Sequence, residues 1–457
     1  MELKPRLLAL SMCAIAWSAS PAYASSQTLS ADSKVTELDL LIDKALAADA
    51  SRKAIFAQSQ AVRETGIASS TLMDPKLKVG FGGLPVDSFQ FDQDPMTNIS
   101  VGLMQQFERG ETLALQLKKA NQQADGMQNQ IAVRELDVAN SITQLWLELG
   151  YQQKAADIIH QNQHLMEELA NFIQTNYSIG KNEAQDLLNA QLQVSKLDEK
   201  LQANAQMQRR LVSQLSEWLG SDWLESTSAI EATNALAWQK LDTNLARSTG
   251  TKHYTLLAKH PMVSMADTLI ETSRTQVDIA EQAYQPQFGV EVMYAYRQAN
   301  GMNGKPASDL VSAYLTLDIP LFTENKQDKT YAAAQYQVGA AQSQRDLLLS
   351  QMNAKVNALL IDKTNLEQRL ERYQSTLLDQ AKARTKAVER GYQNNTAQFN
   401  DVIAAASDEL TLQLEMERLV TDLNIVSSNL ASLLDGFEFD HDHLELTDSD
   451  ISHSQRQ

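Results

Sequence analysis

The residues best suited to chemistry lie close to the end of the sequence, in the stretch Asp440-His441-Asp442-His443. Imidazole nitrogens and carboxylate oxygens are ligands for zinc and other transition metals. The spacing of these residues matches no defined metal motif, and an acidic tail is often only a solvated tail. His441 and His443 are therefore weak metal candidates, and the sequence identifies no firm metal site and no cofactor.

No catalytic constellation is present elsewhere. The sequence has no phosphate-binding glycine loop, no His-Glu-x-x-His pair and no Gly-x-Ser-x-Gly elbow. The single cysteine, Cys13, lies in the segment expected to be removed on export, so the mature chain has no thiolate ligand or cysteine nucleophile. We therefore expect a protein that is not an enzyme.

A different kind of candidate site lies in a stretch that occurs twice, at 177–188 and again 215 residues later at 392–403. Corresponding positions hold the same or similar types: Tyr177 and Tyr392, Asp186 and Asp401, Gly180 and Asn395. Glycine and asparagine adopt most easily the left-handed conformation that ends a helix. The stretch is thus predicted to be a tight turn at the tip of each of two repeated units.

Composition limits the class of protein. The chain has 457 residues, 43% of them hydrophobic, and a formal net charge of −18. An excess of acid argues against nucleic acid as a partner, and no apolar run is long enough for a spanning helix. Residues 1–24 have the form of a signal peptide, with Lys4 and Arg6 before an apolar core and Ala22-Tyr23-Ala24 at its end.

The turns must be positioned by very long helices. Residues 111–175 contain no proline, and Ile131, Val138 and Leu145 keep the seven-residue spacing of coiled helices. A helix of that length would span roughly 100 Å. A second long helix is expected at 326–390, and a single shorter helix at 36–70.

The order of elements divides the chain into two repeats, each with a helix, a β-hairpin, a long helix, a tip and a helix. The signal peptide is predicted at 1–24, and the first repeat at 25–220, with its hairpin at 75–108 and its tip at 176–186. An irregular equatorial segment follows at 221–255. The second repeat is predicted at 256–435, with its hairpin at 286–321 and its tip at 391–401, and an acidic flexible tail at 436–457.

The hairpins alternate between apolar and polar positions. Phe288, Val290 and Val292 share one face of their strand, whereas Glu291 and Arg297 lie on the other. Such a face packs on a core in a soluble protein, or meets lipid in a membrane barrel. Four strands cannot close a barrel, so the second case requires several copies, and three copies would supply twelve strands.

The duplicated unit, the strand exit Asp318-Ile319-Pro320-Leu321-Phe322 and the paired tips together resemble the TolC family of outer-membrane efflux channels. The resemblance implies an α+β membrane protein of Gram-negative cells. It would form a homotrimer, with a twelve-stranded β-barrel in outer-membrane lipid and a long coiled-coil α-helical barrel in the periplasm. It also implies a tripartite pump with a periplasmic adaptor (membrane fusion) protein and an inner-membrane transporter of the resistance-nodulation-division type.

In this family the tips contact the adaptor and close the channel. By position, the resemblance assigns this role to six residues: Tyr177, Gly180, Asp186, Tyr392, Asn395 and Asp401. Asn395 departs from the glycine that is usual in the family, and Ala397 departs from a basic residue. Each aspartate has an equally good explanation as a negative charge at a helix start.

The stretch from Asp74-Pro75-Lys76-Leu77 through Gly83-Leu84-Pro85-Val86-Asp87 to Asp94-Pro95-Met96-Thr97 is similar to the heavy-metal efflux branch of the family. We therefore expect export of heavy-metal cations. Export of drugs or other organic compounds, or type I secretion, remains an alternative within the transport class. A periplasmic coiled-coil scaffold without a pore is the alternative from a different class.

Overall fold

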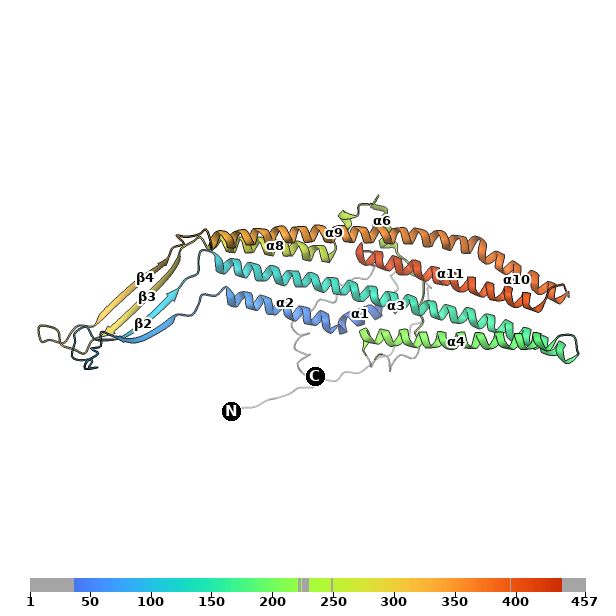
Figure 1. Cartoon of the computed structure of the whole chain (residues 1–457), viewed down its shortest axis with the longest axis horizontal. Coiled ribbons are helices and arrows are strands. Elements are labelled where there is room, and N and C mark those ends of the chain that lie inside the picture. The colour runs from blue at the N-terminus through green and yellow to red at the C-terminus, as the bar shows by residue number, and fades with distance from the viewer. Residues whose placement is uncertain (1–36, 221–222, 224–229, 248–249, 395, 438–457) are drawn as a thin grey trace, which may run out of the picture.

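The computed structural model describes residues 37–220, 223, 230–247, 250–394 and 396–437. They form a long, thin rod with a β-sheet at one end and two helical tips at the other (Figure 1). The predicted signal peptide, His441 and His443 lie outside the described residues. Within those residues, no helix has both the length and the hydrophobicity needed to cross a bilayer.

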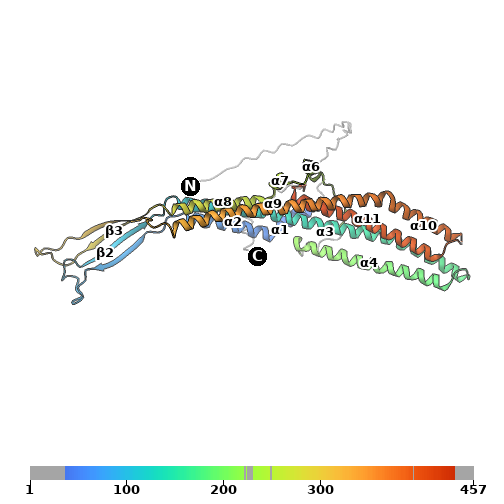
Figure 2. The same ribbon diagram turned by 45° about the horizontal axis from the view of Figure 1, so that its top comes forward.

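The helices form a layer that is one helix thick. Between the sheet and the middle of the rod, the order across the layer is α2, α3, α8, α9 (Figures 1 and 2). Towards the tips, α3 packs on α4 and α11, and α11 packs on α9 and α10. The bounds are α1 Glu37–Ala48, α2 Ala50–Ser69, α3 Thr112–Ser178, α4 Ala184–Leu219, α8 Pro261–Gln282, α9 Gln327–Arg372, α10 Leu378–Gln393 and α11 Phe399–Leu433.

Two of the predicted helices are not continuous. The helix expected at 36–70 is divided at Asp49, whose side chain accepts a hydrogen bond from the Ser51 backbone nitrogen at 2.9 Å and so caps α2. The second long helix contains a π-helical turn, Tyr373–Leu377, between α9 and α10. The first interruption was missed because the heptad pattern runs through it, and a single π-turn leaves no mark on that pattern.

The sheet confirms the prediction of four antiparallel strands. The strand order is β1-β2-β3-β4, with β1 Lys76–Gly82, β2 Asn98–Gln106, β3 Gln287–Tyr296 and β4 Leu310–Asp318. The register places Val79, Val101, Tyr294 and Val311 in one row across all four strands. The two hairpins, far apart in sequence, thus join through β2 and β3 into one surface.

Most apolar side chains of the four strands share one face of this sheet, and that face is uncovered in the single chain. Leu77, Val79 and Phe81 are each about two-thirds exposed. The sheet extends beyond the helices, and no described helix packs over it (Figures 1 and 2). The alternative in which the hairpins pack on a core is therefore not seen among the described residues.

The opposite face of the sheet carries polar and small residues together with a few large apolar ones, such as Met293 and Tyr314. Lys78 on β1 forms an ion pair with Glu291 on β3, with 2.6 Å between nitrogen and oxygen. Where the sheet meets the helices, Arg109 pairs with Asp318 and donates to the Gln285 backbone oxygen at 2.6 Å. These contacts fix the sheet to the start of α3.

The core lies at the middle of the rod, where the equatorial segment crosses the helices. This segment contains α6 Gln239–Arg247 and α7 Tyr254–Leu257. It runs so close to α3 that a Cβ atom on Gly150 would lie 2.2 Å from the Thr233 backbone carbon. Gly436 and Phe437, which the sequence placed in a flexible tail, instead pack here, and Phe437 is 7% exposed.

His260 is the N-cap residue of α8, directly before Pro261. Its Nδ1 accepts a hydrogen bond from the Met262 backbone nitrogen at 3.1 Å, and its Nε2 lies 3.2 Å from the Ser432 backbone oxygen. Burial lowers the pKa of His260 below its ordinary value. The ring is therefore neutral in the folded chain and acts as a helix cap.

Candidate functional site: the paired helical tips

The first tip is a tight turn between α3 and α4. Gly180 has a φ of 75°, and its backbone nitrogen donates to the Tyr177 oxygen at 2.9 Å. A Cβ atom on Gly180 would meet nothing within 4 Å, so the left-handed backbone and not crowding explains the glycine. The second tip, between α10 and α11, contains Asn395, which lies outside the described residues.

Both predicted aspartates occupy the third position of a helix that returns from the tip. Asp401 forms a capping box, in which its carboxylate accepts from the Gln398 backbone nitrogen at 3.0 Å. Asp186 instead accepts from the Asn182 side-chain nitrogen at 3.2 Å. The expected helix-start role is therefore visible in both copies, with a different hydrogen-bond partner in each.

The two tip tyrosines have different surroundings. Tyr392 packs edge-on against Phe172, with ring centroids 6.5 Å apart, and against Phe399 at 5.9 Å. Its hydroxyl accepts a hydrogen bond from the Asn182 side-chain nitrogen at 2.9 Å. Tyr177 is 43% exposed, and its hydroxyl makes no hydrogen bond to any described residue. Only the second tyrosine thus joins the two hairpins.

Asn182 is the centre of a polar chain between the tips. It donates both to the Asp186 carboxylate in its own tip and to the Tyr392 hydroxyl in the other tip. A second bridge, from Asn189 to Asn400 at 3.3 Å, links α4 to α11. At the tips, the two hairpins are thus held together by hydrogen bonds between polar side chains.

An apolar cluster lies behind this chain. Phe399, Ile173 and Ala190 are buried there, at 3%, 0% and 2% exposed, and Tyr392 packs against them. Sequence reasoning missed Asn182 and Phe399, which matter most for joining the tips. The available signal was a difference between the repeats, since Asn182 corresponds to Ala397, and Phe399 corresponds to Ala184.

A groove of about 590 Å³ separates α3 from α10 and α11 above the tips. Its wall on α3 is mixed and includes Leu165, Leu169 and Phe172 beside the charged Glu168. Glu389 and Glu409 lie on the other side. Such a mixed surface suits contact with another protein helix. It provides no nucleophile paired with a base.

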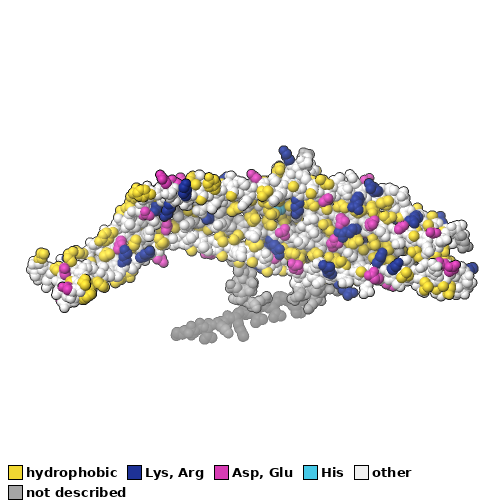
Figure 3. All heavy atoms as spheres, viewed as in Figure 1, with side chains coloured by type: hydrophobic (Ala, Val, Ile, Leu, Met, Phe, Trp, Pro, Cys, Tyr) yellow, Lys and Arg dark blue, Asp and Glu magenta, His cyan; other side chains and the backbone are white. Residues whose placement is uncertain are grey.

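No group of three or more metal-ligating side chains occurs in the part of the chain that the structure describes. Charged side chains of both signs are interspersed along the helical part, on the face shown in Figure 3. One charged pair has a structural role: two guanidinium nitrogens of Arg418 on α11 donate to the two carboxylate oxygens of Glu148 on α3, at 2.8 and 2.7 Å.

Comparison with known proteins relates this geometry to a family. Residues 253–436 match the model of the family described as outer membrane efflux protein. No curated protein sequence matches the chain significantly. The matched residues include the whole predicted second repeat, with β3, β4 and the second tip.

Solved structures share the fold at low sequence identity. A membrane protein from Pseudomonas aeruginosa superimposes with a TM-score of 0.72 at 14% identity, over 87% of this chain and 90% of the other. The outer membrane protein VceC from Vibrio cholerae gives 0.68 at 16%, over 88% and 97%. The outer membrane channel MtrE from Neisseria gonorrhoeae, in its open state, gives 0.66 at 12%, over 87% and 89%.

Residues 253–436 therefore resemble the outer membrane efflux protein family, and over most of its length the chain shares the fold of solved outer-membrane channels.

Proposed function

We propose that this protein is one subunit of a passive exit duct for an efflux pump in the outer membrane. The observation that carries the proposal is the uncovered apolar face of the sheet. From Phe288 to Tyr296, β3 rises roughly 27 Å at about 3.4 Å per residue. With the usual tilt of barrel strands this becomes about 20 Å along the membrane normal, close to the apolar band of membrane barrels.

The edges of the sheet support assembly into a homotrimer. β1 and β4 are the outer strands, and each has one row of backbone N–H and C=O groups without a strand partner. Unpaired backbone groups cannot stand in lipid, so the sheet has to close. Four strands are too few, and three copies supply twelve, in the size range of known membrane barrels.

The opposite end of the rod would lie in the periplasm and meet the pump. Ile179, Leu188 and Leu192 are apolar and more than half exposed near the first tip. Exposed apolar side chains of this kind favour contact with a protein partner. We assign that contact to a periplasmic adaptor, with an inner-membrane transporter of the resistance-nodulation-division type as the energy source. The tip residues, including Tyr177 and Asp401, would then form the gate.

For the exported substrate we propose heavy-metal cations. The support is the similarity of the stretch 74–97 to the heavy-metal branch, together with the acidic balance of the chain. A threefold ring of Asp401 at the entrance would favour cations by charge. Organic compounds are the competing substrate class.

Membrane fractionation, followed by native mass determination of the detergent-extracted protein, tests the proposal. A trimer in the outer membrane is expected. A soluble periplasmic monomer or dimer would instead indicate the coiled-coil scaffold, and would leave the apolar sheet face without an explanation. Sensitivity of a deletion strain to metal salts, compared with organic toxins, then separates the two substrate classes.

A further inference from the structure

The groove between α3, α10 and α11, which we call the tip groove, has the size of a small-molecule site. Its volume of about 590 Å³ lies within the usual range for ligand pockets. Because α11 packs on both α3 and α10, it closes the groove from behind. Its residues Val402 and Ala406 line the groove and are buried, as are Met166 of α3 and Thr385 of α10. Three helices of one chain therefore fix the shape of the groove.

Part of the lining of the tip groove is apolar and open to solvent. Leu165 and Phe172 on α3 are 56% and 50% exposed, and both line the groove. At the end nearest the tips, the rings of Phe172 and Tyr392 pack edge-on with their centroids 6.5 Å apart. A ligand with an apolar body would remove this surface from water, and aromatic rings also attract cations.

Every charged side chain that lines the tip groove is acidic. Each of the three helices supplies one carboxylate: Glu168 from α3, Glu389 from α10 and Glu409 from α11. Among the described residues, none of the three pairs with a lysine or an arginine. Glu409 accepts a hydrogen bond from the Gln413 side-chain nitrogen at 3.3 Å, and Glu168 lies 3.5 Å from His164, which is charged only when protonated. The groove therefore complements a positive charge.

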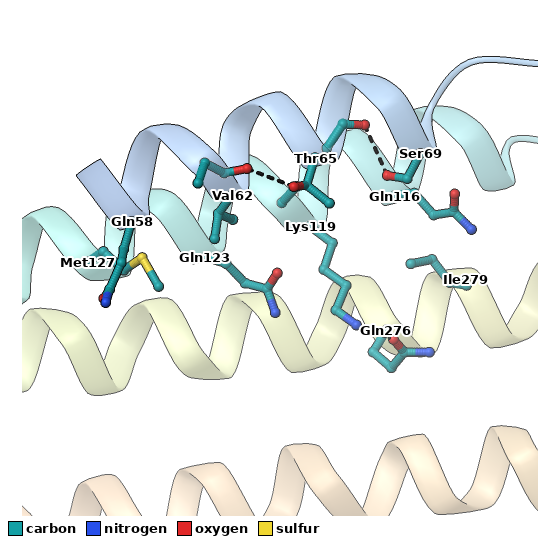
Figure 4. Close-up of a pocket in the computed structure, with 13 residues that line it drawn as sticks. Gln58, Val62, Thr65, Ser69, Gln116, Lys119, Gln123, Met127, Gln276 and Ile279 are labelled. Carbon is teal, nitrogen blue, oxygen red and sulfur yellow. Dashed lines mark hydrogen bonds between the residues drawn. The ribbon is translucent and has the colours of Figure 1, made fainter. Parts of the chain in front are cut away.

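A second groove, nearer the sheet, has a different lining. It has a volume of about 660 Å³ and combines amides and hydroxyls with small or aliphatic side chains from α2, α3 and α8 (Figure 4). The one charged side chain in its lining is Lys119, whose Nζ donates to Gln276 Oε1 at 2.7 Å. This groove is lined by neither an aromatic ring nor a carboxylate. A cation with an apolar body is thus complementary to the tip groove and not to this one.

The volume of the tip groove separates a small molecule from a protein helix as its occupant. The lining on α3 extends from Ile158 to Phe172, which is about 21 Å of helix. A partner helix of that length and about 10 Å across would occupy roughly 1,600 Å³. Such a helix would rest on the rim of the groove, whereas a small molecule would fill it.

We propose that the tip groove binds organic cations with an aromatic or aliphatic body, one in each chain. The apolar body would lie against Leu165 and Phe172. The positive charge would lie among the three carboxylates of the lining. A bare metal ion would leave the apolar wall uncovered, and an anion would meet only like charges.

The site touches the joint between the two tips. Tyr392 lines the tip groove, and its hydroxyl also accepts the hydrogen bond from Asn182. A bound cation would therefore contact a residue that holds the two helical hairpins together. The inference goes beyond the proposed exit duct and does not require the trimer, because a single chain forms the whole groove.

Two ions of equal size and shape but opposite charge test the site. Tetraphenylphosphonium should bind the full-length protein in a nonionic detergent, with one ion per chain by isothermal titration calorimetry after subtraction of empty micelles. Tetraphenylborate should bind at least about tenfold more weakly, because it would meet three carboxylates. The affinity for the cation should fall several-fold between about 0.05 M and about 0.5 M sodium chloride, because salt screens exposed charges.

Matched glutamine variants locate the site. Glu168→Gln, Glu389→Gln and Glu409→Gln should each weaken binding of the cation by about two- to fivefold, and the triple variant by at least about tenfold. Glu167→Gln is the control, because Glu167 is also exposed and adjacent in sequence but lines a groove between α3 and α4. This variant should leave the affinity unchanged. Leu165→Ala should weaken binding without changing its salt dependence.

The possible failures are distinguishable. Equal affinity for the two ions, or equal weakening by Glu167→Gln and Glu168→Gln, would overturn the site. A trimer in the outer membrane that does not bind the cation would overturn the site but leave the proposed function intact. A soluble monomer that binds the cation with the expected pattern of variants would support the site and overturn the proposed function.

Discussion

The hydrogen bond between Asn182 and Tyr392 gives the most direct test of the tips. Tyr392→Phe removes only the hydroxyl that accepts the 2.9 Å hydrogen bond from Asn182. The ring and its contacts with Phe172 and Phe399 are retained. The change therefore separates the polar link between the two hairpins from the apolar packing behind it.

The expected loss of free energy on Tyr392→Phe follows from the type of hydrogen bond that is removed. A hydrogen bond between neutral groups contributes a net stabilisation of about 1 kcal/mol. In a trimer three such bonds would act together, giving about 3 kcal/mol, or on the order of 100-fold in the equilibrium between joined and separated hairpins. If the joined state is the closed channel, Tyr392→Phe should increase the time spent open by a factor of this order.

Conductance of the purified channel in planar lipid bilayers is the assay. Tyr177→Phe is the matched control, because it removes the hydroxyl of the repeat counterpart, which makes no hydrogen bond to any described residue. Asn182→Ala should open the channel at least as much as Tyr392→Phe. The double variant should add little to the larger single effect, because both changes remove the same bond.

Two results would refute this reasoning. Equal conductance for Tyr392→Phe, Tyr177→Phe and the unchanged protein would show that the bond does not hold the tips. Fully additive effects of Asn182→Ala and Tyr392→Phe would show that the two residues act independently.

Three further predictions concern the equator and the sheet. Gly150→Ala should lower the free energy of unfolding by about 1–3 kcal/mol, because the added methyl group would collide with the equatorial backbone. Gly339→Ala is the control: the space around Gly339 is open, so this change should be neutral or stabilising by up to about 1 kcal/mol. Thermal melts of the two variants measure the difference. Burial lowers the pKa of His260, so its contribution to stability is present above about pH 6.5 and is lost as the pH falls through the lower folded-state pKa. In denaturant titrations at several pH values, the free energy of unfolding of His260→Asn should therefore change less with pH than that of the unchanged protein. Val292→Arg, on the apolar face, should cost about 2–4 kcal/mol and reduce heat-resistant trimer on gels, whereas Ser312→Arg on the opposite face should have little effect.

Sequence periods determined the kinds of element and their order. The alternation of apolar with other residues from Phe288 to Tyr296 predicts a strand, because successive side chains of a strand point to opposite faces of a sheet. A long proline-free stretch with heptad spacing likewise has to be a long helix. The 215-residue offset between Tyr177 and Tyr392 located both turns, because a turn requires particular residue types locally.

Local interruptions were not predictable in the same way. The break at Asp49 depends on its hydrogen bond to Ser51 and on its ion pair with Arg134, 2.8 Å apart and 85 residues away in sequence. The close crossing at Gly150 depends on where the equatorial chain passes. Neither contact leaves a periodic pattern in the sequence from which it could be predicted.

The sequence by itself determined that the chain contains two similar hairpins of helices and four strands with one apolar face, because periodicity and repetition are properties of the order of residues. Only the tertiary structure decided that the two β-hairpins join through β2 and β3 into one sheet with an uncovered apolar face, and that Asn182 joins the first tip to Tyr392 in the second. These facts depend on distances between residues far apart in the chain, and those distances are set by packing.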